Sequence, residues 1–584
     1  MLHTRLGFAL AVLATLTACA QTASVPDAAL SVSTTSTPQE AGPQGLDAPL
    51  FYELLVGEMS ARQGDATTAV ALLLDAARET QSQALYRRAT DIALRARSGP
   101  RALEAAQAWQ QAFPDARDAN RYLLQILLML NRVSESEAPL TRELAATPLA
   151  SKPALYLAIA QLYRHVSDKS LAAAVVEQAL QSDLHQPATQ PNALTLVGHM
   201  RLAANQKTLA LQAAQQAHGL APDNGAVALL ALELLENQVP QAEAMVRSYL
   251  EHGPAPAIRL AYARVLLDQQ RLSDAIAQLD AVIAQSPQQA EAWFALAAAH
   301  AQLGQADQAE RALQAYLPLI ERMPEAAQRR HALQQASILG ARSALQANQL
   351  ELATQWLQRV PNDKLLSLQS LRAAVLAKQG KLPQARALIR ATPSSGPAED
   401  LRKKQAEVQV LRDAGALQEA YALQTQVQQA QPEDADITYE TALLAERVGD
   451  LDTMEALLRS IMLRHPDYHH AYNALGYSLA DRGVRLDEAR ALVEQALQLA
   501  PNDPFITDSL GWVEFRQGNW QQALTLLEKA YALRDDVEIA THLAEVHWTM
   551  GERARALSLW RQALQRDPDN AVLRATLQRL QVQP

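Results

Sequence analysis

A repeat of about 34 residues constrains what this sequence can fold into more than any other feature. Glycines recur in the C-terminal part at spacings of 34, 34, 35 and 33 residues: Gly415, Gly449, Gly483, Gly518 and Gly551. Prolines recur at a second fixed place in the unit: Pro432, Pro466, Pro501 and Pro568. Glycine readily adopts the left-handed conformation that ends a helix, and proline ends one helix and begins the next. Each unit therefore predicts two short helices joined by a tight turn.

The composition agrees with an all-α architecture and excludes several other classes. Alanine and leucine make up most of the 49% of residues that are hydrophobic, and glutamine is abundant; all three are good helix formers. The net charge of −10 argues against nucleic-acid binding, which needs a basic face. The single cysteine, Cys19, leaves no intrachain disulfide, Cys-rich zinc site or iron–sulfur cluster.

The repeat resembles the tetratricopeptide repeat, most closely at residues 471–477, 510–530 and 553–568, with further good units at 194–222 and 293–313. The resemblance implies a right-handed superhelical solenoid with a long concave surface. The pattern is weak at residues 120–150 and 320–400. We expect irregular helical repeats over residues 49–390 and well-formed repeats over residues 391–584.

The N-terminus is typical of an export signal. A short basic start leads into an apolar run of about eleven residues, too short to span a bilayer, and the run ends in Leu16-Thr17-Ala18-Cys19. This ending resembles the lipobox of bacterial lipoproteins. It implies removal of residues 1–18, acylation of Cys19, and, with no Asp after the cysteine, an outer-membrane anchor with the body in the periplasm. The alternative is an ordinary signal peptide with Cys19 incidental.

Residues 19–48 then form the lipidated cysteine and a tether, rich in Ser, Thr, Pro and Gly, that we expect to be disordered.

Motifs for catalysis or cofactor binding are not found. The sequence has no phosphate loop, dinucleotide fingerprint, nucleophile elbow or zinc-protease motif. His465, His469 and His470 have only Asp467 nearby, and His542 and His547 lie five residues apart rather than four. We therefore expect no enzyme activity, no metal site and no cofactor.

Aromatic residues gather near the C-terminus, where ten of the 27 lie between residues 465 and 560. Positions 2, 5, 9, 12 and 13 of the first helix of a tetratricopeptide unit face the groove. Counting from the small residue at position 8 gives a candidate partner-binding groove: His470, Asn473, Tyr477, Asp481, Phe505, Asp508, Trp512, Phe515, Arg516, Glu538, Thr541, Glu545 and Trp548. Such a composition is typical of a binding hot spot. The alternative is that these rings pack between successive repeats.

The runs at residues 473–477, 508–512 and 538–546, with residues 50–55 near the start, are similar to outer-membrane tetratricopeptide lipoproteins of the LbcA type. That resemblance implies a non-enzymatic adaptor whose partners are a periplasmic carboxyl-terminal processing protease and its cell-wall hydrolase substrates. One alternative is an envelope-assembly lipoprotein, either an activator of a peptidoglycan synthase or a factor for secretin or pilus assembly. Another is a carbohydrate-binding or enzymatic exporter component.

Overall fold

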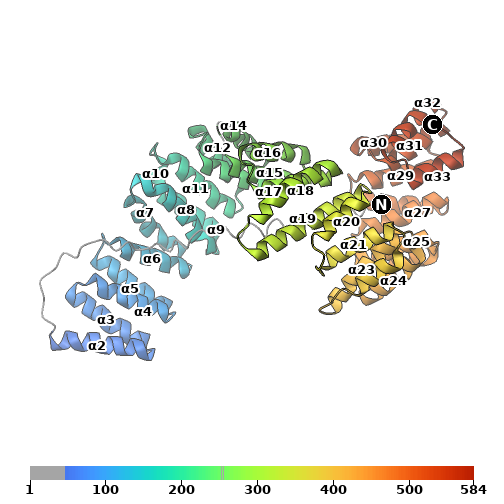
Figure 1. Cartoon of the computed structure of the whole chain (residues 1–584). Coiled ribbons are helices and arrows are strands. Elements are labelled where there is room, and N and C mark those ends of the chain that lie inside the picture. Colours follow the sequence, from blue (N-terminus) through green and yellow to red (C-terminus); the bar gives the residue numbers. More distant parts are fainter. Residues whose placement is uncertain (1–46, 252, 254) are drawn as a thin grey trace. The chain divides into compact units, whose positions relative to one another are not determined.

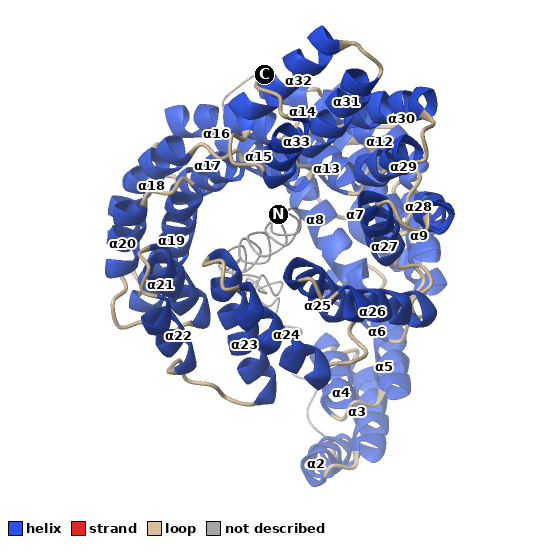
Figure 2. Cartoon of the chain, turned by 90° about the vertical axis from the view of Figure 1, so that its right-hand side faces the viewer, coloured by secondary structure: helices blue, strands red, loops and turns tan. Residues whose placement is uncertain are grey.

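The computed structural model describes residues 47–253 without 252, and residues 255–584. The predicted signal peptide, Cys19 and nearly all of the predicted tether lie outside these residues. Within them every regular element is a helix, and short loops join the helices (Figure 2). The predicted all-α class is therefore confirmed.

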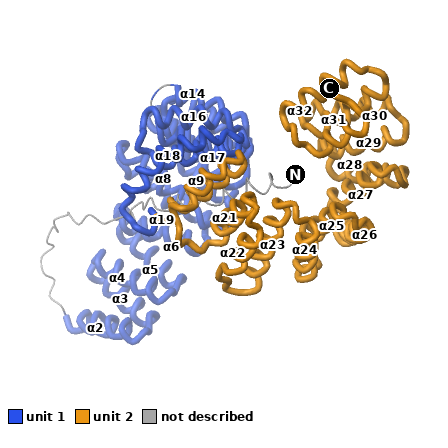
Figure 3. The backbone as a smooth tube through the Cα atoms, turned by 45° about the vertical axis from the view of Figure 1, so that its right-hand side comes forward, with its two compact units in different colours: residues 1–329 blue, residues 330–584 orange. Residues whose placement is uncertain are grey.

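The chain divides into two compact units, residues 1–329 and 330–584 (Figure 3). The division falls inside α19. The change in repeat regularity expected near residue 390 is a separate feature and stays a prediction.

In the first unit, helices pair as antiparallel hairpins such as α2 with α3, α4 with α5 and α11 with α12 (Figure 1). Its α-helices, up to the one that crosses the division, are α2 (Ala48–Gln63), α3 (Ala66–Thr80), α4 (Gln83–Arg95), α5 (Gly99–Ala112), α6 (Arg117–Met129), α7 (Glu137–Ala145), α8 (Lys152–Leu162), α9 (Lys169–Ala179), α10 (Gln181–Leu184), α11 (Gln190–Ala203), α12 (Lys207–Leu220), α13 (Gly225–Glu236), α14 (Glu243–Glu251), α15 (Pro256–Asp268), α16 (Leu272–Gln285), α17 (Ala290–Gln302), α18 (Ala306–Glu321) and α19 (Ala326–Gln346). Among the described residues of this unit, four short 3₁₀ segments accompany them: Val133–Ser136, Leu149–Ser151, Tyr163–His165 and Pro240–Ala242.

The second unit continues the same hairpins, α21 with α22 through α31 with α32. Its remaining helices are α20 (Leu350–Gln358), α21 (Leu366–Lys378), α22 (Leu382–Arg390), α23 (Pro397–Asp413), α24 (Leu417–Ala430), α25 (Ala435–Val448), α26 (Leu451–Arg464), α27 (His469–Arg482), α28 (Leu486–Leu499), α29 (Pro504–Arg516), α30 (Trp520–Leu533), α31 (Val537–Thr549), α32 (Arg553–Arg566) and α33 (Ala571–Leu580).

The recurring glycines end the first helix of each hairpin, as predicted. All five have positive φ, between 69° at Gly483 and 91° at Gly551. In hairpins without a glycine at this place, another residue takes it with positive φ: Arg97, Asn131, Asn205, Gln238, Gln270 and Asn348. Asparagine tolerates the left-handed region better than most residues, which explains the turns at Asn131, Asn205 and Asn348.

Small residues allow the two helices of a hairpin to approach closely. A Cβ added at Gly476 would lie 2.5 Å from Val493 Cγ2 and 2.9 Å from the backbone oxygen of Ala489. Beside this contact Leu475 is completely buried, as is Val493. The hairpin α27–α28 therefore has room for glycine only.

Candidate binding surface

The residues predicted to line the groove come from three successive first helices, α27, α29 and α31. Four side chains of these helices meet: Tyr477, Asp508, Trp512 and His542. His542 Nδ1 lies 2.9 Å from Asp508 Oδ2, and its Nε2 lies 3.4 Å from the Tyr477 hydroxyl. The Trp512 ring stacks on the imidazole with centroids 4.4 Å apart. We call this group the His542 cluster.

The His542 cluster is largely closed to solvent. Trp512 is 3% exposed, His542 3% and Asp508 6%. Burial raises the pKa of Tyr477 well above its ordinary value, and the carboxylates of Asp508, Asp481, Glu538 and Glu446 raise it further. Trp512, one of the residues predicted to line the groove, is thus buried against an imidazole from the next hairpin.

Other predicted residues have contacts of their own. Arg516 Nη1 donates to the backbone oxygen of Asp481 at 2.8 Å. Arg579 of α33 forms an ion pair with the buried Glu545 at 2.6 Å, and Arg553 lies 3.7 Å above the Trp548 ring.

Among the same residues, His470 lies 6.0 Å from Tyr439, ring centroid to centroid. The Thr541 hydroxyl donates to the oxygen of Val537. Phe505 lies under Arg534 and Phe515 lies against Trp512, while Asn473 Oδ1 is buried without a hydrogen-bond donor. A partner-binding role for the set stays a prediction.

Burial also raises the pKa of Glu538, which is half-buried on α31, and the nearby carboxylates of Asp536 and Asp508 add to this shift. In the part of the chain that the structure describes, no group of three His, Cys, Asp or Glu residues could hold a metal ion.

A second surface, not singled out from the sequence, lies on the first described helix. Phe51, Tyr52, Leu55 and Met59 of α2 are 47–62% exposed. The opposite side of α2 packs on α3 through Leu54, Gly57 and Ala61. In the sequence, these large apolar residues recur at helical spacing. Small and aliphatic residues of the same helix form the side that packs on α3.

The described end of the second unit is different. The outer side of α33 exposes Arg574, Gln578 and Arg579, while Leu573 and Thr576 face inward. The outer side of α33 is therefore polar, whereas the exposed side of α2 is apolar.

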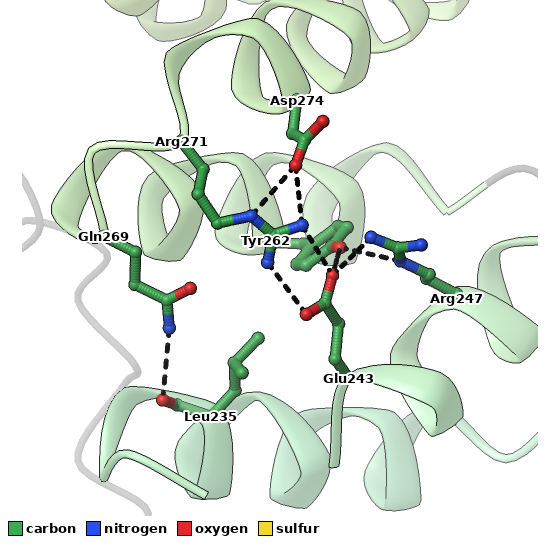
Figure 4. A network of polar contacts seen from close by, with 7 residues as sticks. All are labelled: Leu235, Glu243, Arg247, Tyr262, Gln269, Arg271 and Asp274. Carbon is green, nitrogen blue, oxygen red and sulfur yellow. Dashed lines mark hydrogen bonds and ion pairs between the residues drawn. The ribbon is translucent and has the colours of Figure 1, made fainter. Parts of the chain in front are cut away.

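A polar network fastens α14 to α15 and α16 in the first unit (Figure 4). The Glu243 carboxylate accepts from both Nη atoms of Arg271 at 2.8 and 2.9 Å, and from the Tyr262 hydroxyl and Arg247 at 2.6 Å each. Arg271 also forms an ion pair with Asp274. The Arg271 hydrogen bonds outweigh burial and, with Tyr262 and Arg247, lower the pKa of Glu243 to about 2.

We expect Glu243→Gln to destabilise the first unit by about 1.5–3 kcal/mol at pH 7, the usual value of a hydrogen bond to a charged group. Because the folded-state pKa is lowered, the wild-type advantage is present above the ordinary value of 4.5 and is lost as pH falls toward 2. Chemical denaturation at pH 7, 5 and 3 measures the difference. Glu233→Gln, at an exposed pair with His199, is the control, and an equal loss there would contradict the role of the network.

Family models of the tetratricopeptide repeat match this chain at residues 229–290, 266–332, 366–391, 439–504 and 514–580. The last two ranges include Tyr477 of α27 and His542 of α31, whereas Asp508 and Trp512 of α29 lie between the two ranges. These ranges of the chain carry tetratricopeptide repeats. Proteins with such repeats bind protein partners in general, so the repeats indicate a scaffold for protein–protein interaction.

The relatives are similar over parts of their length. TPR repeat-containing protein PA4667 of Pseudomonas aeruginosa is 35% identical over 208 residues, which are 35% of this chain and 35% of that protein. The cell division cycle protein 16 homolog of Homo sapiens is 36% identical over 110 residues, 17% of each chain. The matches thus span about a third or less of these relatives.

Among solved structures, a tetratricopeptide repeat protein from Parabacteroides merdae is 16% identical, with a TM-score of 0.35 over 42% of this chain and 98% of that one. Among the described residues, no helix is both long enough and apolar enough to cross a bilayer.

Proposed function

We propose that this tetratricopeptide protein is a periplasmic adaptor, anchored to the outer membrane through an acylated Cys19, that holds protein partners and catalyses no reaction itself. Its proposed partners are a carboxyl-terminal processing serine protease and the cell-wall hydrolases that this protease degrades. The lipobox-like ending at residues 16–19 supports the anchor, and the similarity at residues 473–477, 508–512 and 538–546 supports the choice of partners.

The observation that carries the adaptor proposal is the apolar face of α2. Four large side chains on one helix are about half exposed, and no described residue covers them. Contiguous exposed apolar residues on a folded protein mark an interaction site, because leaving them in water has a free-energy cost. We therefore place one partner contact at Phe51, Tyr52, Leu55 and Met59.

We expect Phe51, Tyr52, Leu55 and Met59 all changed to Ser to abolish recovery of the protease with the protein. The side chains are exposed, so the fold should tolerate the change, and circular dichroism confirms that. Tagged full-length protein is purified from detergent-solubilised envelopes, and co-purified proteins are identified by mass spectrometry.

The matched control is Leu463→Ser with Leu533→Ser, which removes leucines that are 85% and 51% exposed on α26 and α30. This variant should recover partners as the wild type does. Undiminished protease with the α2 variant would exclude α2 as the contact. Wild-type protein that enriches neither a protease nor a wall hydrolase would overturn the adaptor proposal itself.

A further inference from the structure

The His542 cluster joins three consecutive hairpins through a single imidazole. His542 projects from α31 onto the carboxylate of Asp508 in α29, and both carboxylate oxygens lie within 3.0 Å of Nδ1. The Tyr477 hydroxyl of α27 reaches the other ring nitrogen. Trp512 covers the flat side of the imidazole. A change in the charge of this one buried ring therefore affects the contacts among all three helices.

The groups that face this imidazole are mostly acidic. Asp508 lies on α29, Glu538 and Glu545 lie on α31 itself, and α27 contributes the neutral Tyr477. Arg579 of α33 forms an ion pair with Glu545.

The other two helices packed on α31 approach its opposite side. There Glu528 of α30 and Arg555 of α32 line a shallow surface cavity together with His547. His547 Nδ1 in turn lies 2.9 Å from Glu552. These charged groups lie beside His547, and they do not face His542.

We propose that the His542–Asp508 pair is a pH-operated clasp that holds α29 against α31 when the imidazole is protonated and releases it when the imidazole is neutral. Deprotonation leaves the Asp508 carboxylate buried without its counter-charge and close to Glu538. Burying an unpaired charge is strongly unfavourable, so the hairpins α29–α30 and α31–α32 open more readily at higher pH.

The direction of the pKa shift of His542 is the one that the clasp requires. Burial by itself would lower the pKa of His542, but the Asp508 carboxylate, with Glu538 and Glu545, raises it above the ordinary value of 6.5. A raised folded-state pKa means that the stabilisation is complete below the ordinary value and is lost as pH rises through the folded-state value. The half-buried Glu538, whose pKa is also raised, changes stability in the same direction.

The clasp does not depend on which partner the protein binds. Its consequence is that the inner side of α27, α29 and α31, with Tyr477 and Trp512, is more ordered in mildly acidic than in mildly alkaline conditions. Any ligand that needs this side ordered binds more tightly at the lower pH.

Hydrogen exchange of the full-length protein, followed by mass spectrometry at pH 6 and pH 8.5 and corrected for intrinsic rates, tests the proposal. We expect the opening equilibrium of α31 to increase tenfold for each pKa unit by which His542 is raised. Helix α17, in the first unit, should not change. Exchange of the imidazole Cε1 proton, measured in the same samples, gives the titration of His542 directly.

His542→Gln keeps a neutral donor toward Asp508 and should remove the pH dependence of α31. Asp508→Asn, a second variant that retains the histidine, should reduce it. His199→Gln removes the exposed histidine–glutamate pair of the first unit and should leave it unchanged. Equal protection of wild-type α31 at both pH values, or a pH dependence that persists in both His542→Gln and Asp508→Asn, would overturn the clasp.

Discussion

Replacing Lys152 with Met is expected to destabilise the first unit by about 3–5 kcal/mol, because it leaves a buried carboxylate without its counter-charge. Lys152 begins α8 and is 7% exposed, and it forms an ion pair with Asp183 of α10, which is 2% exposed. The Tyr156 hydroxyl donates to the same carboxylate at 2.9 Å, and burial together with this contact raises the pKa of Tyr156. One hydroxyl cannot replace the lost ammonium.

Thermal unfolding followed by circular dichroism measures this effect, and limited proteolysis assigns the early transition to residues in the first unit. A loss of this size lowers the melting temperature by about 6 °C or more. Lys152→Met combined with Asp183→Leu removes both charges and should recover most of the stability, because an apolar pair can replace a buried ion pair. A single variant that melts like the wild type would show that Asp183 is neutralised by another route.

Replacing Trp560 with Ala is expected to destabilise the last hairpins by about 3–5 kcal/mol, the usual cost of removing a fully buried aromatic side chain. Trp560 of α32 is 0% exposed and packs with Ala540, Ala544 and Leu573. Its ring lies 5.5 Å from Trp548, centroid to centroid. The indole nitrogen has no hydrogen-bond acceptor, so the loss is one of packing and apolar burial.

Urea unfolding of the full-length protein, with hydrogen exchange to locate the change, tests this prediction. In a repeat array each hairpin contacts mainly its neighbours, so α31 to α33 should lose protection first and the first unit should keep it. Trp520→Ala, which removes a tryptophan that is 46% exposed on α30, is the control and should be nearly neutral. Comparable losses from the two variants would contradict the assignment of the effect to packing.

Much of the fold could be predicted because the residues that end the helices recur at a fixed spacing. Gly449 and Gly483 occupy positions where the chain needs positive φ, so their spacing revealed the hairpin length directly. Where Asn131 or Gln270 fills that position, the spacing signal disappears although the turn remains. The irregular stretch from α7 to α10, with its 3₁₀ segments, is stabilised by side-chain pairs far apart in sequence, and periodicity carries no information about those.

The candidate site was predicted less completely. The numbering of the tetratricopeptide unit placed Tyr477, Asp508 and Trp512 at groove-facing positions of successive hairpins, and the structure brings all three together. It could not show that the His542 side chain, next in sequence to the predicted Thr541, would stack on Trp512 and that Trp512 would be buried. Nor could it show the exposed side of α2, because apolar residues at helical spacing look the same whether a neighbour covers them or not.

The Lys152–Asp183 pair also has a consequence for how the chain assembles. Hairpins built largely from alanine and leucine offer one another similar faces, so apolar contact alone discriminates poorly between a correct and an incorrect neighbour. An ion pair buried between α8 and α10 is satisfied in one register only, and a hairpin docked out of order would enclose one charge without the other. We expect the pair to act against mis-pairing during folding, in a stretch of the chain where 3₁₀ segments lie between the α-helices.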